Sequence, residues 1–251
     1  MAERTAVTLT VEDGVAWITL TDPGRRNSLN PVLVTQLADA CALVRADRDV
    51  RAAVLRAEGP VFSAGGDLDS LGTVPADPTA VYRGFEALAA LPVPTLAAVH
   101  APAIGAGVSF ALACDVIVAG RSARFDPRFL DLAIHPGGAH LWRLEQRVGH
   151  QAATALILFG EAVTGEQAAQ VGLAWRCVPD EDLPALVSAM AARAAGRPAP
   201  LVRRTKSVMA LGRALTDPSA AADVEQVAQN WSVRQPEHLD AVRRVRDHVR
   251  R

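Results

Sequence analysis

The 251-residue sequence predicts an α/β layered fold with a helical segment at its C-terminal end. Two apolar stretches, VRAAVLRAE (50–58) and PTLAAVHA (94–101), are typical of buried strands, and each leads into a turn rich in small residues. Strands that alternate with helical patterns indicate an α/β fold. From Thr164 onward the pattern becomes mostly helical apart from LAWRCV (173–178).

The elements of the N-terminal half follow from local signals. VTLTVEDGVAWITL (7–20) alternates apolar and polar residues on both sides of Asp13-Gly14, a dipeptide that favours a tight hairpin turn. Asn30 and Pro31 are typical of an N-cap and a first helical residue, and we expect this helix to end near Arg45. The uncharged stretch after Glu86 predicts a buried strand, a loop and a buried helix.

Later in the chain, TGEQ (164–167) has the form of a helical capping box. Gly196, Pro198 and Pro200 then interrupt the helical pattern. We therefore expect a core over residues 1–195 and a C-terminal helical segment over residues 196–251.

Composition limits the kinds of partner. Half of the residues are apolar, enough for one large core, and a net charge of -1 creates no field that would attract nucleic acid or an acidic membrane. The three cysteines lie far apart, which indicates neither a disulfide framework nor a metal site. The N-terminus has no apolar signal segment. We expect a cytoplasmic protein without a metal that binds a small molecule, not nucleic acid or a membrane.

Two turns of small residues are the candidate functional elements: FSAGGDL (62–68) and IGAG (104–107). Glycine and alanine let a ligand approach the backbone, and a turn that enters a helix leaves N–H groups unpaired. Two such groups that converge form an oxyanion hole, which stabilises negative charge on a carbonyl oxygen. Close packing is the alternative explanation for either turn taken alone.

Together with four further motifs, these turns resemble the crotonase, or enoyl-CoA hydratase/isomerase, superfamily. The further motifs are RRNSLN (25–30), ACDVIVA (113–119), HPGGAHLWRL (135–144) and GEAVTGEQAAQVGLAWRCV (160–178). The resemblance covers about residues 5 to 210. It implies a spiral of ββα repeats that binds acyl-CoA, with C-terminal helices that pack in a homotrimer or a dimer of trimers.

The resemblance also implies a set of site residues. Gly66 and Ala106 correspond to the two oxyanion N–H donors, and Arg25 or Arg26 is placed to meet CoA phosphates. Asp67 corresponds to a residue that caps the next helix. The residues implied to bind substrate or CoA are Arg25, Arg26, Ser28, Ala64, Gly66, Asp67, Leu68, Gly105, Ser109, Phe129 and Gly137. No permanently bound cofactor is implied, because coenzyme A enters as part of the thioester.

The sequence departs from the hydratases of this family at both catalytic glutamates. Ser109 stands in the place of the first and Phe129 in the place of the second. A lone serine is no general base at neutral pH and phenylalanine transfers no proton, so the two-glutamate mechanism is not available. Asp131, His135 and His140 are the nearby candidates for the acid/base group.

Three functions remain open at this stage. The first is an acyl-CoA enzyme, a lyase or isomerase, that acts through a thioester enolate with an atypical acid/base group. The second is a non-catalytic acyl-CoA binding protein. The third is a serine hydrolase, because GVSFA (107–111) has the outline of a nucleophile elbow around Ser109. Its partners would be His238 with Asp240 or His248 with Asp247.

Overall fold

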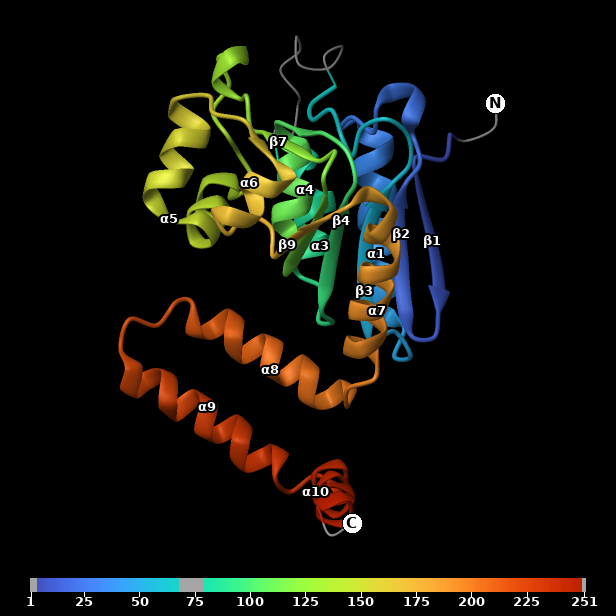
Figure 1. Cartoon of the computed structure of the whole chain (residues 1–251), viewed down its shortest axis with the longest axis vertical. Coiled ribbons are helices and arrows are strands. Elements are labelled where there is room, and N and C mark those ends of the chain that lie inside the picture. The colour runs from blue at the N-terminus through green and yellow to red at the C-terminus, as the bar shows by residue number, and fades with distance from the viewer. Residues whose placement is uncertain (1–3, 68–78, 250–251) are drawn as a thin grey trace.

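A six-stranded sheet in the order β1-β2-β3-β4-β6-β9 runs through the computed structural model, which describes residues 4–67 and 79–249 (Figure 1). Only β1 runs antiparallel to its neighbour in this sheet. The strands are β1 (Val7–Glu12), β2 (Val15–Leu20), β3 (Ala52–Ala57), β4 (Thr95–Val99), β6 (Val116–Gly120) and β9 (Arg176–Val178). A smaller sheet has the order β5-β7-β8 and consists of β5 (Ala103–Ile104), β7 (Arg124–Asp126) and β8 (Val163–Thr164).

The predicted hairpin and first helix are confirmed. Asp13 and Gly14 turn the chain between β1 and β2 with φ angles of 52° and 78°. The Asn30 side chain accepts a hydrogen bond from the backbone N–H of Leu33, and Pro31 is the first residue of α1 (Pro31–Ala46). The local capping signals therefore determine where this helix begins.

Helices cover both faces of the large sheet. Helices α1 and α3 (Arg83–Ala89) lie on one face and α7 (Leu183–Ala195) on the other (Figure 1). Successive residues of a strand point to opposite faces, so Leu55 packs in the core with Leu37 of α1 while Val54 packs with Val187 of α7. A parallel sheet buried on both faces explains why the strands read as continuous apolar runs.

The uncharged stretch after Glu86 folds as predicted, with the buried strand β4, a loop containing β5, and the buried helix α4 (Ala106–Ala113). Further along, the capping box is present: Thr164 and Gln167 exchange hydrogen bonds at the start of α6 (Gly165–Gln170). Helix α5 (His140–Leu158) is interrupted at Gly149, whose φ is 74°. Short 3-10 turns complete the core: η1 (Pro23–Arg25), η2 (Ala80–Tyr82), η3 (Leu130–Leu132) and η4 (Asp180–Asp182).

The last three helices, α8 (Ala199–Gly212), α9 (Pro218–Ser232) and α10 (Pro236–Val249), lie beyond one end of the sheet (Figure 1). Helix α8 is tied to the core by Lys206, whose Nζ lies 2.6 Å from the Asp115 carboxylate and donates to the Val93 carbonyl. No side chain of α8 or α9 is fully buried. The C-terminal helices therefore add little to the core of the single chain.

A search of the described residues finds no helix that combines the length and the apolar character needed to span a membrane.

Candidate functional site

The two small-residue turns lie backbone against backbone. The N–H of Ile104 donates to the Ser63 carbonyl at 2.9 Å. A Cβ atom on Gly65 would lie 2.4 Å from the Ile104 oxygen, and one on Gly107 would lie 2.5 Å from the Ser63 oxygen. Gly65 also has a φ of +83°, which favours glycine. The glycines are therefore required because the two segments touch without room for a side chain.

Both predicted oxyanion donors are unpaired at this contact. Gly65 and Asp67 make the backbone hydrogen bonds to Leu29, so the intervening N–H of Gly66 points away from that strand partner. Ala106 is the first residue of α4, where a helix leaves its N–H groups without an internal acceptor. In the described part of the chain neither N–H has a hydrogen-bond acceptor.

A buried asparagine holds the first turn in place. Asn27 is fully buried, and its side chain accepts from the Asp22 N–H and donates to the carbonyls of Glu58 and Val61. Its own carbonyl accepts from the Ser63 hydroxyl at 2.7 Å. The sequence predicts no role for Asn27, although a polar residue at the centre of RRNSLN is a possible signal.

Several of the residues expected near CoA lie in or beside the first small-residue turn, FSAGGDL. Arg25 and Arg26 are exposed, and Arg25 lies 3.5 Å from the carboxylate of Asp67. Ser28 is buried, and Ala64 donates its N–H to the Arg26 carbonyl. Leu68, and the helix that Asp67 was expected to cap, lie outside the described residues.

Ser109, Phe129 and His140 form one cluster. The Ser109 Oγ lies 2.8 Å from His140 Nδ1, and the two residues are 2% and 1% exposed. The rings of Phe129 and His140 meet edge to face with centroids 4.8 Å apart. The fold therefore brings one predicted acid/base candidate against both residues, Ser109 and Phe129, that the resemblance aligns with hydratase glutamates.

His140 is neutral at physiological pH. Burial, with a smaller contribution from the nearby Arg143, lowers its pKa to about 4. Its second ring nitrogen, Nε2, is buried and has no hydrogen-bond partner. A histidine in this state offers a neutral imidazole with one uncommitted nitrogen.

The Pro-Gly-Gly turn at residues 136–138 positions His140 beside Ser109. A Cβ on Gly137 would lie 2.0 Å from the Tyr82 hydroxyl, and one on Gly138 would lie 2.3 Å from the Phe85 ring. The turn therefore lies against Tyr82 of η2 and Phe85 of α3. Ala139, with φ of 59°, then reverses the backbone, and α5 begins at His140.

The other two acid/base candidates are more exposed. Asp131 lies in η3 and is exposed. His135 is also exposed, and its Nδ1 lies 2.8 Å from the Pro136 carbonyl oxygen. Neither takes part in the hydrogen bond or the ring contact that define the Ser109 cluster.

The nucleophile-elbow interpretation requires Ser109 on the turn between strand and helix. Ser109 instead lies inside α4, three residues after its first residue. Its hydrogen bond is with His140 and not with the C-terminal histidines considered from the sequence. His238 is exposed on α10, and the His248 side chain lies outside the described residues.

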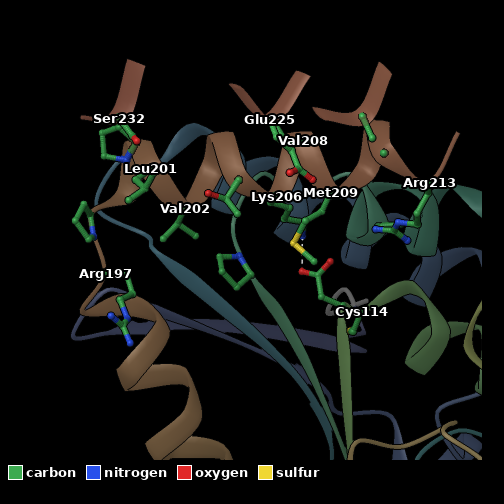
Figure 2. Close-up of a pocket in the computed structure, with 18 of the residues that line it drawn as sticks. Cys114, Arg197, Leu201, Val202, Lys206, Val208, Met209, Arg213, Glu225 and Ser232 are labelled. Carbon is green, nitrogen blue, oxygen red and sulfur yellow. Dashed lines mark hydrogen bonds and ion pairs between the residues drawn. The ribbon is translucent and has the colours of Figure 1, made fainter. Parts of the chain in front are cut away.

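A separate groove of about 1190 Å³ lies between the C-terminal helices and the core. Figure 2 shows Val202, Lys206 and Met209 of α8 on one side and Cys114, at the end of α4, on the other. The lining of this groove includes neither oxyanion turn and neither Ser109 nor His140. It is therefore distinct from the candidate site.

In residues 4–67 and 79–249, no group of three or more His, Cys, Asp or Glu side chains is placed to hold a metal ion.

A family profile for enoyl-CoA hydratase/isomerase matches residues 10–237, and the chain belongs to this family. A probable enoyl-CoA hydratase of Mycobacterium tuberculosis, echA14, is 40% identical over 231 residues, which cover 90% of this chain and 88% of the relative. The 1,2-epoxyphenylacetyl-CoA isomerase of Escherichia coli is 35% identical over 197 residues, 75% of each chain. A putative enoyl-CoA hydratase of Thermobifida fusca, solved in complex with CoA, is 33% identical with a TM-score of 0.82, covering 91% of this chain and 93% of that one.

The lowered pKa of His140 predicts acid sensitivity of the fold. An unfolded histidine binds a proton below about pH 6.5, whereas folded His140 does so only near pH 4. The unfolded state therefore binds more protons in this window, and the free energy of unfolding falls as pH decreases from 6.5 to 4, by on the order of 3 kcal/mol.

His140→Gln should flatten this dependence of the free energy of unfolding on pH, as measured by urea titrations. The same substitution at an exposed histidine of α5, His150→Gln, is the matched control. An unchanged slope in His140→Gln would contradict this assignment.

Proposed function

We propose that this protein binds acyl-CoA thioesters and stabilises their enolate form through the N–H groups of Gly66 and Ala106. The observation that carries this proposal is the contact between the two turns, which leaves both N–H groups without an acceptor. Preorganised donors of this kind are most effective where negative charge develops on a carbonyl oxygen. The thioester oxygen would occupy that position, with coenzyme A entering as part of the substrate.

Two further features support a CoA thioester as the ligand. The exposed guanidinium groups of Arg25 and Arg26 lie beside the first turn, where they can bind phosphate groups. The Thermobifida fusca relative was solved with CoA. The family resemblance assigns the remaining contacts to Ser28, Ala64, Asp67, Leu68, Gly105, Ser109, Phe129 and Gly137.

The acid/base chemistry favours reactions that move a proton over reactions that add water. Hydration in this family uses two carboxylates to position and deprotonate a water, and Ser109 and Phe129 provide neither. An enolate can still be protonated at a different carbon, which is an isomerisation. Asp131, His135 and His140 are the candidate proton carriers. A non-catalytic acyl-CoA binding protein and a serine hydrolase remain the alternatives that the following experiments separate.

Substitution of Ala106 tests the oxyanion hole directly. Proline is tolerated at the first position of a helix because the N–H it lacks has no helical acceptor. Ala106→Pro should therefore fold but lose about 10²- to 10³-fold in turnover of 3-butenoyl-CoA to crotonyl-CoA, measured by ultraviolet absorbance. Ala106→Gly keeps the N–H and is the matched control. Equal rates in the two variants would show that this N–H does not stabilise the reaction.

Hydration of crotonyl-CoA by the wild-type protein should be very slow. Each missing acid/base group is worth about 10²- to 10⁴-fold in rate. The measurement is the loss of crotonyl-CoA absorbance beside a hydratase that carries both glutamates. Hydration at a comparable rate would contradict the proposal, whereas tight binding without any turnover would support the non-catalytic alternative.

We further propose that residues 196–251 mediate assembly into a trimer or a dimer of trimers. The C-terminal helices leave apolar side chains such as Leu201, Met209 and Leu211 exposed in the single chain. Light scattering at micromolar concentration should report three or six copies. Met209→Glu should shift that mass toward the monomer, and a wild-type monomer would contradict the proposal.

A further inference from the structure

We propose that Ser109 and His140 form the proton-transfer pair of this site: His140 Nε2 exchanges a proton with the substrate, and Ser109 positions the imidazole. This inference rests on the proposed enolate function. It selects one of three candidate residues and gives a role to the serine that replaces a glutamate. The argument depends on the position of the pair, its hydrogen bonding and its charge.

The position of the pair follows from the helix that carries the oxyanion donor. Ser109 follows Ala106 by three residues in α4, and residues with this spacing are neighbours on one helix face. A carbonyl oxygen held at the Ala106 N–H therefore places the adjacent substrate carbons near the face that bears Ser109. His140 approaches the same face from the start of α5.

The hydrogen bonding of His140 leaves one nitrogen to be explained. His140 Nδ1 forms a hydrogen bond with Ser109, and the rings of His140 and Phe129 pack edge to face. His140 Nε2 is buried and has no hydrogen-bond partner. A buried polar atom without a hydrogen-bond partner destabilises the folded state. Such an atom calls for a functional or structural explanation. A nitrogen whose partner is the substrate accounts for it.

The serine can set the tautomer of the imidazole. Ser109 Oγ and His140 Nδ1 lie 2.8 Å apart, and the hydroxyl can donate or accept according to the tautomer of the imidazole. When the serine oxygen accepts from His140 Nδ1–H, the lone pair resides on Nε2. Ser109, which aligns with the first glutamate of the hydratases, thus acts through His140.

The surrounding charges favour a neutral imidazole before the reaction. Arg143 on α5 opposes a second positive charge, and Glu86 of α3 interacts with Arg143. Phe129 contributes only an apolar ring, and Tyr82 of η2 lies against Gly137. The negative enolate supplies the missing counter-charge, so imidazolium and enolate stabilise each other as they form together.

With 3-butenoyl-CoA as the substrate, proton transfer through His140 needs no other reactant. Nε2 takes a proton from C2, and the C–H electron pair forms the enolate whose oxygen is held by Gly66 and Ala106. The imidazolium then returns this proton to C4, which yields crotonyl-CoA, or to C2, which regenerates the substrate. If the imidazolium first exchanges its proton with D₂O, return to C2 places deuterium there. No bond to CoA breaks and no water is added.

The central experiment compares His140→Gln with wild type on 3-butenoyl-CoA. Proton nuclear magnetic resonance in D₂O follows exchange at C2, and absorbance follows isomerisation. We expect both rates to fall at least about 100-fold while the Kd for the thioester changes little, because only proton transfer is lost. His150→Gln, an exposed histidine of α5, should retain both rates. His140→Phe repeats the comparison if the glutamine variant does not fold.

A positioning role for Ser109 is tested separately, through kcat and KM of its variants. Ser109→Ala should lower kcat about tenfold with little change in KM, the effect of one lost hydrogen bond, and Ser109→Thr should restore part of it. Complete loss in Ser109→Ala, with an acyl-serine detected by mass spectrometry in wild type, would overturn the inference in favour of the hydrolase.

The outcomes separate this inference from the proposed function. Exchange that requires the Ala106 N–H but survives in His140→Gln overturns the inference and leaves the enolate function standing. If His135→Gln or Asp131→Asn alone abolishes exchange, the proton carrier is that residue instead. Wild-type protein that binds 3-butenoyl-CoA without exchange or isomerisation overturns the inference, and absence of binding overturns both.

Discussion

The side-chain-free contact between the turns at Gly65 and Gly107 is the constraint on which the candidate site depends. The Gly65 position faces the Ile104 oxygen and the Gly107 position faces the Ser63 oxygen, both at distances that exclude a Cβ atom. This approach brings Gly65, the neighbour of Gly66, against the Ala106 backbone, because a Cβ on Gly65 would lie 3.2 Å from the Ala106 nitrogen. A side chain at either glycine would separate the turns and with them the two donors.

Buried polar groups and aromatic packing support that contact from opposite directions. Asn27 ties the first turn to the loops at Asp22 and Glu58, so the turn cannot shift without breaking several buried hydrogen bonds. On the other side, Phe85 packs against Phe110 of α4 and against the Gly138 turn. The position of His140 is therefore set by the same core that orients α4.

The site combines a family framework with local chemistry of its own. The proposed oxyanion donors are backbone N–H groups, so they do not depend on the identity of the surrounding side chains. The cluster of Ser109, Phe129 and His140 does depend on side-chain identity, because it contains one buried, neutral imidazole. Under the proposed function, the same backbone framework could support different proton transfers as these three side chains change.

The sequence alone determined the local elements and predicted the two turns that carry the proposed oxyanion donors. Asp13-Gly14, Asn30-Pro31 and the Thr164 capping box act over a few residues, so their turn and helix starts were predictable and are confirmed. Only the tertiary structure paired Ser109 with His140, because these residues are separated by 31 positions and meet through the packing of α4 against α5, with the turn before α5 held against Tyr82 and Phe85. Periodicity and capping carry no information on such a contact, and the burial that lowers the His140 pKa arises only when both segments and Phe129 close around the ring.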